Sequence, residues 1–236
     1  MKCSLYWSVD SDGKTPIDGI AGVTDVVSAS FNTLRLIRDA KKLFIVRDND
    51  ATRRALKKYS DALLIGESTE PGLPFICSNN PVDVLKVEIG GKTIIQKTNN
   101  GTTAVADAIT RSADPVFSFH WANIKTIADW LKKQNPSHIT LIASGGREEV
   151  FKKSHGHLME DWYCAEALQR LLTGKRIDYD AYFLETRKTM SLQYPAGDPG
   201  EEAMTLLFQK KELFSGIVPV FTRIDEGIYR ASNSLE

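Results

Sequence analysis

Short apolar runs alternate with amphipathic helical patterns along most of this chain, and this alternation restricts its fold more than any other feature. We predict strands at 20–27, 42–46, 62–66, 92–96, 115–119 and 138–144. We predict helices at 30–40, 50–60, 102–113, 122–134 and 158–174, the last ending at Gly174. Apolar strands that alternate with helices of this length indicate a layered α/β fold with a mainly parallel sheet.

The C-terminal part departs from this alternation. Residues 197–211 predict a turn followed by a helix, and residues 218–232 could hold a late edge strand. No repeat of fixed period, linker or low-complexity segment divides the 236 residues, a length within range for one α/β unit. We therefore expect a single domain over residues 1–236.

The composition argues against several classes of protein. Lysine plus arginine equals aspartate plus glutamate at 30 each, which argues against a broad nucleic-acid surface. The three cysteines form no CxxC pair, so we expect reduced thiols in a cytoplasmic protein. The start of the chain lacks the apolar core of a signal peptide, and no run approaches the length of a membrane span. A homodimer is expected only from the general frequency of symmetric oligomers.

Polar loops follow several of the predicted strands. Asp25 lies near the end of the first strand, Glu67 follows the third, the stretch KTNNGTT the fourth and Gly145 the sixth. Ligands of open parallel sheets bind beyond the carboxyl ends of the strands. We therefore expect these loops to share one edge of the sheet.

The loop KTNNGTT has the chemistry of an anion site. Its two asparagines and its glycine tolerate tight left-handed turns, and Thr102 or Thr103 can cap the helix that follows. The amides of that helix's first turn have no internal partners, so a phosphate or sulfonate suits them better than a neutral ligand. The alternative is an ordinary N-cap after a turn, which the short motif taken alone favours.

Two acidic residues, Glu160 and Asp161, open the predicted helix at 158–174. Acids there commonly complement the helix dipole. Two adjacent carboxylates can also bind Mg²⁺, a hard cation that takes oxygen ligands and keeps waters. Asp161 lies partly on the inward face of this helix, which slightly favours a functional role.

Three further polar features have both a functional and a structural interpretation. His120 follows the strand at 115–119 and can donate to an anion or transfer a proton, although a packed, hydrogen-bonded histidine is somewhat better supported. Asn79 can reach a ligand or simply start the turn before Pro81. His155 and His157 suit surface positions better than a zinc site.

Common nucleotide and hydrolase motifs do not occur. The glycine loop at 145–149 lacks the GxxxxGK[ST] and GxGxxG spacings, so nucleotide binding is unsupported. No GxSxG elbow or HExxH motif occurs either.

Taken together and in order, seven segments resemble the 2-phosphosulfolactate phosphatase family. They are TDVVSAS, LIGE, SNNPVDV, KTNNGTTAV, FHWANIKTIADWL, LIASG and EDWYCAEALQRLL. The tail, KKELFSG followed by TRID, resembles the ending of the family. The most specific pieces are the NNGT loop, the spacing of GE and NNP, and the late helix with ED and CAEAL.

The resemblance implies a Mg²⁺-dependent phosphatase with a three-layer α/β/α fold. Members remove phosphate from 2-phospho-3-sulfolactate, a step towards coenzyme M in methanogens, and members also occur in organisms that make no coenzyme M. The resemblance carries functional roles, not divided further, to Asp25, Glu67, Asn79, Asn100, Gly101, Thr102, Gly145, Glu160 and Asp161.

The chain departs from the family pattern at three of these segments. Ser28 stands where an arginine is expected, and an arginine fork matches phosphate or sulfonate well. This loss weakens the case for a doubly anionic substrate. Asn99 replaces a threonine, and His120 stands where a small hydroxyl is expected. The substrate could differ, or the missing charge could come from another residue, namely Lys97, Arg147 or Lys125.

The sequence therefore predicts a Mg²⁺-dependent phosphatase that hydrolyses a small anionic phosphoester, the phosphomonoester of a small acid. The predicted metal ligands are some of Asp25, Glu67, Glu160 and Asp161. The predicted phosphate contacts are Asn79, Thr98, Asn99, Asn100, Gly101, Thr102 and Gly145. Asp25 is the first choice for acid, base or nucleophile, and His120 is the second. The alternatives are a non-catalytic binding protein for a phosphorylated or sulfonated metabolite, and hydrolysis of a different ester.

Overall fold

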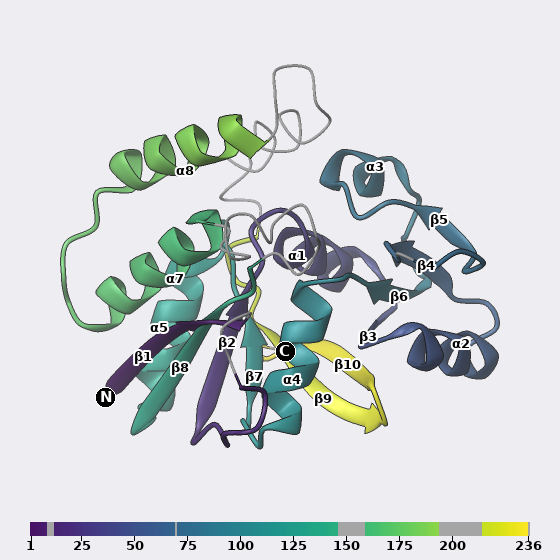
Figure 1. Cartoon of the computed structure of the whole chain (residues 1–236), viewed down its shortest axis with the longest axis horizontal. Coiled ribbons are helices and arrows are strands. Elements are labelled where there is room, and N and C mark those ends of the chain that lie inside the picture. The colour runs from purple at the N-terminus through teal and green to yellow at the C-terminus, as the bar shows by residue number, and fades with distance from the viewer. Residues whose placement is uncertain (9–11, 69, 146–158, 194–213, 236) are drawn as a thin grey trace.

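The computed structural model describes residues 1–8, 12–68, 70–145, 159–193 and 214–235. These residues form a mixed α/β fold with one ten-stranded, mostly parallel sheet and seven helices (Figure 1). The predicted fold class is confirmed at this level, and the expected three-layer arrangement stays a prediction. The six strands and five helices predicted for the alternating part of the chain are all present, and the predicted helix at 197–211 lies outside the described residues.

The sheet combines strands from the whole length of the chain. In spatial order they are β1 (Lys2–Trp7), β8 (His138–Ala143), β2 (Ile20–Thr24), β7 (Val116–Ser118), β9 (Pro219–Asp225), β10 (Ile228–Asn233), β3 (Lys42–Val46), β6 (Thr93–Lys97), β4 (Leu63–Gly66) and β5 (Phe75–Cys77). The first four strands are mutually parallel, as are the last four. The sheet therefore consists of two parallel groups with an antiparallel hairpin between them.

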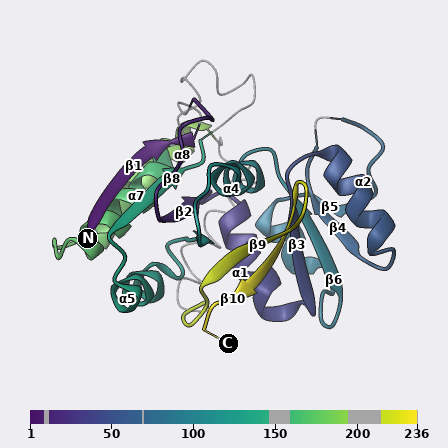
Figure 2. The same cartoon turned by 90° about the horizontal axis from the view of Figure 1, so that it is seen from below.

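That hairpin, β9–β10, corrects the prediction of a late edge strand in 218–232. It lies in the middle of the sheet, with β9 antiparallel to β7 and β10 antiparallel to β3 (Figure 2). Three antiparallel pairings in succession separate β7 from β3, so the two parallel groups run in opposite senses. The carboxyl ends of all the parallel strands therefore cannot lie along one common edge of this sheet.

The seven helices connect or follow these strands. They are α1 (Ala29–Asp39), α2 (Asn49–Lys58), α3 (Pro81–Lys86), α4 (Gly101–Thr110), α5 (Ile124–Gln134), α7 (Met159–Leu172) and α8 (Tyr179–Gln193). Five of them were predicted within a few residues, whereas α3 and α8 were not predicted. Among the described residues, no helix combines the length and apolar character needed to cross a membrane.

The helices bury the apolar strand residues in separate clusters. Side chains of α4 and α1 form one cluster with β2, β3 and β6. Side chains of α5 and α7 form a second with β2, β7 and β8, and those of α2 form a third with β3, β4 and β6. Each large apolar side chain fully buried in this way contributes about 1.5–3 kcal/mol. This packing fixes the position of the loops that lead into α1 and α4.

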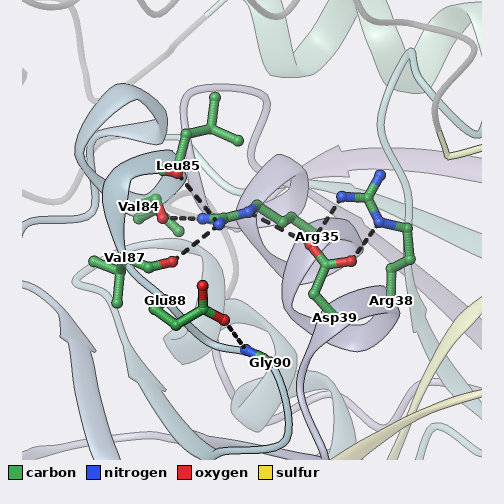
Figure 3. A network of polar contacts seen from close by, with 8 residues as sticks. All are labelled: Arg35, Arg38, Asp39, Val84, Leu85, Val87, Glu88 and Gly90. Atoms are coloured by element: carbon green, nitrogen blue, oxygen red, sulfur yellow. Dashed lines mark hydrogen bonds and ion pairs between the residues drawn. The ribbon is translucent and has the colours of Figure 1, made fainter.

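Arg35 of α1 fastens α3 to the rest of the molecule (Figure 3). Its buried guanidinium donates hydrogen bonds to the carbonyl oxygens of Val84, Leu85 and Val87 at the end of α3. Its Nε lies 3.6 Å from a carboxylate oxygen of Asp39, one turn further along α1. A cation suits this place because the carbonyls of a helix's last turn carry partial negative charge.

Candidate active site

The N-termini of α1 and α4 meet beside the end of β2. Gly101 opens α4 and lies directly against Ala29, the first residue of α1, and against Asp25. A Cβ atom at Gly101 would lie 2.6 Å from Ala29 Cβ and 2.8 Å from Asp25 Oδ2. Only glycine permits this approach, because real Cβ atoms do not come so close to other heavy atoms. Two helix N-termini therefore converge on one carboxylate.

Asp25 is the centre of this arrangement. It is buried, and its Oδ1 accepts a hydrogen bond from the amide of Ala29 at 3.3 Å. Its own amide donates to Ser30 Oγ at 2.9 Å. Burial, and after it the charge of Glu67, raises the pKa of Asp25 to about 6. A carboxylate with this pKa can exchange protons near neutral pH.

Asp161, at the start of α7, links three elements. Its Oδ1 accepts from the amide of Val26 at 2.7 Å, and its Oδ2 accepts from Ser144 Oγ at 2.8 Å and from the amide of Gly145 at 3.1 Å. These bonds join the ends of β2 and β8 to the first turn of α7. Burial, followed by the charge of Glu160, raises the pKa of Asp161 well above its usual range.

Glu160, next to Asp161, has a free oxygen. The side chain is 1% exposed, and its Oε2 has no hydrogen-bond partner among the residues that the structure describes. Burial raises its pKa to about 7, and the charge of Asp25 adds to that effect. A buried carboxylate oxygen without a partner is costly unless a proton or a cation compensates it.

Glu67 joins the site from the second parallel group of strands. Its amide donates to the carbonyl of Lys97 at 2.9 Å, and its Oε1 accepts from the amide of Asn99 at 3.1 Å. The charge of Glu67 also acts on Asp25. Asp25, Glu67 and the NNGT loop therefore lie close together, as predicted. They meet where the N-termini of α1 and α4 contact each other, and not along one edge of the sheet.

The NNGT loop is closed by a reciprocal pair of threonines. Thr98 Oγ1 accepts from the amide of Thr102 at 3.0 Å, while Thr102 Oγ1 accepts from the amide of Thr98 at 3.0 Å. Thr102 therefore lies inside α4, and Asn100 occupies the N-cap position, which corrects the expectation of a threonine cap. The amide of Asn99 is directed at Glu67, so part of the expected anion cradle holds a carboxylate of the chain itself.

The donor set fits Mg²⁺ held largely by water. Among the described residues, no three histidine, cysteine, aspartate or glutamate side chains are grouped closely enough to hold a metal ion. Mg²⁺ needs only one or two carboxylates, because it retains several of its waters. The unpartnered oxygen of Glu160, beside the buried Asp25, meets that requirement.

Asn79 and His120 occupy more enclosed positions. Asn79 is buried, and Asn32 Nδ2 of α1 donates to its carbonyl oxygen at 2.7 Å and to its Oδ1 at 3.0 Å. His120 is 1% exposed, packs edge-on against Phe31, and accepts a hydrogen bond on Nδ1 from the amide of Ala122 at 3.0 Å. Burial lowers the pKa of His120 to about 3, which suits a neutral packing residue better than a proton carrier.

Sequence reasoning did not single out two serines that support the acids. Ser30 accepts from the amide of Asp25, and Ser144 donates to Asp161. Ser144 directly follows the strand β8, and Ser30 follows Asp25 within one loop and helix start. Ser144 has the same sequence feature that indicated Asp25 and Glu67, a polar residue at or directly after the end of an apolar strand.

Comparison with known proteins shows the family of this chain. The family model of 2-phosphosulpholactate phosphatase matches residues 8–210. A probable 2-phosphosulfolactate phosphatase of Bacillus subtilis (strain 168) is 28% identical over 203 residues, covering 83% of this chain and 84% of the relative. One of Deinococcus radiodurans is 26% identical over 189 residues, covering 77% and 72%. One of Caldicellulosiruptor saccharolyticus is 28% identical over 155 residues, covering 63% and 60%.

These matches show an enzyme of the phosphatase class, and the structure gives it an α/β fold. The chain belongs to the 2-phosphosulfolactate phosphatase family. Both the family resemblance and the predicted phosphoric monoester hydrolase are thereby confirmed.

Proposed function

We propose that this protein is a Mg²⁺-dependent phosphatase that hydrolyses the phosphomonoester of a small acid such as 2-phosphosulfolactate. The observation that carries the proposal is the position of Asp25, which is buried where the N-termini of α1 and α4 meet. Membership of the family supports the reaction class, and the names of the relatives supply the first substrate to try.

Helix N-termini are suited to a phosphoryl group because their free amides and dipoles favour negative charge. In hydrolysis, charge spreads over the non-bridging phosphoryl oxygens, so donors fixed in advance lower the barrier. The amides of Ala29 and Thr102 already bond to Asp25 and Thr98, so the first turns of α1 and α4 would act on the phosphoryl group mainly through their dipoles. The Thr98–Thr102 pair keeps the start of α4 in place while the substrate binds.

Asp25 is the proton-transfer group of the proposed mechanism. Its pKa, raised to about 6, leaves it largely ionised at neutral pH and able to take a proton from the attacking water. Mg²⁺, held by Glu160 with one neighbouring carboxylate and waters, would neutralise phosphoryl oxygens and orient that water. Asp161 positions the site, because its three hydrogen bonds hold the ends of β2 and β8 against α7.

The test is phosphate release from a panel of phospho-acids, with 2-phosphosulfolactate first, and from p-nitrophenyl phosphate. Each compound is assayed with Mg²⁺ and with EDTA. Asp25→Asn should lower kcat by at least 100-fold, because an amide cannot accept the proton. Asp129→Asn, at an exposed position of α5, makes the same chemical change away from the site and should keep full activity.

The rival function is binding of a phosphorylated or sulfonated metabolite without turnover. It is favoured by Ser28, a buried and uncharged residue at the start of α1 where the family pattern has an arginine. Anion binding that ignores EDTA, with no phosphate released from any compound, would establish this rival. Full turnover by Asp25→Asn would instead remove Asp25 from the mechanism and leave the phosphatase standing.

A further inference from the structure

We propose that Lys97 is the cationic contact for the phosphoryl group in this site. Lys97 ends β6 and directly precedes the loop that opens α4. This assignment deepens the proposed function, since it rests on a phosphate bound at the meeting of α1 and α4. It also accounts for a charge that the start of α1 lacks, where Ser28 is neutral.

The first observation is that Lys97 is a buried cation with no carboxylate oxygen within 4.0 Å of its Nζ among the described residues, while the charge of Glu67 acts on it from further away. The residue is 6% exposed, and its Nζ donates to Asn99 Oδ1 at 3.0 Å, a neutral acceptor. None of the ion pairs closer than 4.0 Å among the described residues includes Lys97. A buried ammonium is costly unless an anion compensates it, and it has three N–H donors to offer.

The second observation is that Lys97 is fixed in place beside the site. The carbonyl of Lys97 accepts from the amide of Glu67, and a Cβ at Gly66 would collide with the same carbonyl at 1.8 Å. The side chain reaches Asn99, whose amide bonds to Glu67. Hydrogen bonds therefore link Lys97, Glu67 and the NNGT loop, and the charge of Glu67 acts on Asp25.

The third observation is that the described residues offer few other cations near this site. Of the two other candidates named from the sequence, Arg147 lies outside the described residues, and Lys125 lies over the ring of Tyr179, 5.4 Å from its centroid. Arg47, at the end of β3, is 45% exposed and already pairs with Asp107 at 3.2 Å. The first turns of α1 and α4 contain no lysine or arginine. The acids of the site repel an anionic substrate, so a fixed positive charge is needed besides the metal. A lysine offers a point charge to one oxygen, in contrast to the fork of an arginine.

The experiment measures binding of inorganic phosphate by isothermal titration calorimetry with Mg²⁺ present, and KM and kcat in parallel. Lys97→Met should weaken phosphate binding by about 10- to 100-fold, the range of a hydrogen bond to a charged group. Lys97→Arg should recover most of the affinity. Lys92→Met removes the same charge from an exposed residue just before the other end of β6, and should bind phosphate like the wild type.

A role limited to holding Asn99 gives a different result. If Lys97 acts only through that bond, Asn99→Ala reproduces the loss of Lys97→Met, and the double variant is no worse than either. That outcome, or unchanged phosphate binding in folded Lys97→Met, overturns the proposal. If Lys97→Met does not fold, Lys97→Gln replaces it, and failure of both to fold makes Lys97 a structural residue and also overturns the proposal.

The outcomes separate this inference from the proposed function. A wild-type protein that binds phosphate through Lys97 but releases none from any ester refutes the phosphatase and keeps the anion site. A working phosphatase whose KM and phosphate affinity ignore Lys97→Met refutes the role of Lys97 alone. A wild-type protein that binds no phosphate refutes the anion site.

Discussion

At the scale of the residue, the site depends on one glycine as much as on its acids. Gly101 lets the first turn of α4 approach Asp25 and Ala29 so closely that no side chain fits between them. The sequence predicted Gly101 as part of a turn that binds phosphate. The structure gives it a second role, since its missing Cβ is what brings two helix N-termini to one carboxylate.

Gly101→Ala should therefore destabilise the fold and impair the site together. The added Cβ would meet a backbone-fixed Ala29 Cβ at 2.6 Å, and overpacking of this kind costs about 1–3 kcal/mol. The free energy of unfolding is measured by urea denaturation, and kcat by phosphate release. Gly90→Ala is the matched control, because its Cβ would meet only the flexible end of Glu88. Equal stability of the two variants would contradict the close packing of α1 and α4.

At the scale of the element, α3 depends on a partner for its position. It has six residues, and a helix so short is marginal by itself in water. Arg35 bonds to the carbonyls at its end, and Asn32 bonds to Asn79 just before its start. Both partners belong to α1, so α1 carries the loop of Asn79 as well as one side of the active site.

Arg35→Met should lower the free energy of unfolding by about 1–3 kcal/mol, because it leaves the carbonyls of α3 without their donor. Hydrogen exchange of the α3 amides should accelerate more than that of the sheet. Arg53→Met, at a residue of α2 whose side chain is 54% exposed, should change stability by less than about 0.5 kcal/mol. An unchanged exchange rate in α3 would show that the helix is held by apolar packing instead.

The elements that the sequence missed or misplaced were overlooked for different physical reasons. The strand β1 has exposed and half-buried residues along an edge, and β5 and α3 are too short for a periodic signal. The hairpin β9–β10 had a usable signal in Gly227, which adopts a φ of 67° between two alternating runs. The strands that were predicted are those buried on both faces, where continuous apolar runs are required.

At the scale of the whole molecule, the sequence predicted which loops meet but not how. The prediction assumed one parallel sheet with one ligand edge. The β9–β10 hairpin reverses the second group of strands, and the loops meet because α1 and α4 start against each other. Pairing between distant strands decides this outcome, and it leaves no local pattern in the chain. The acids could be predicted because each directly follows a strand or opens a helix.

The buried acids of the site should make the free energy of unfolding fall as the pH rises. The pKa of Glu160 is raised from 4.5 to about 7 and that of Asp161 is also raised, so the folded state binds more protons than the unfolded state near neutral pH. The free energy of unfolding must then fall as pH rises from the unfolded pKa to the folded pKa, and it levels off above the folded pKa. His120, whose pKa is lowered from 6.5 to about 3, acts in the opposite direction, but only below its unfolded value.

The decline should therefore be clearest between about pH 4.5 and 7, where Glu160 is ionised in the unfolded chain but still protonated in the folded one, at up to about 1.4 kcal/mol per pH unit for each such acid. Below pH 6.5, His120 offsets the effect of one acid. Urea denaturation in EDTA across this range measures it. Glu160→Gln, which cannot ionise, should flatten the decline, whereas Asp129→Asn on the surface of α5 should leave it unchanged. Mg²⁺ at pH 8 should restore stability in the wild type more than in Glu160→Gln, because a cation bound by the ionised acid stabilises only the folded state. A flat profile in the wild type would mean that the acids are compensated without metal or proton, and would count against a cation site at Glu160.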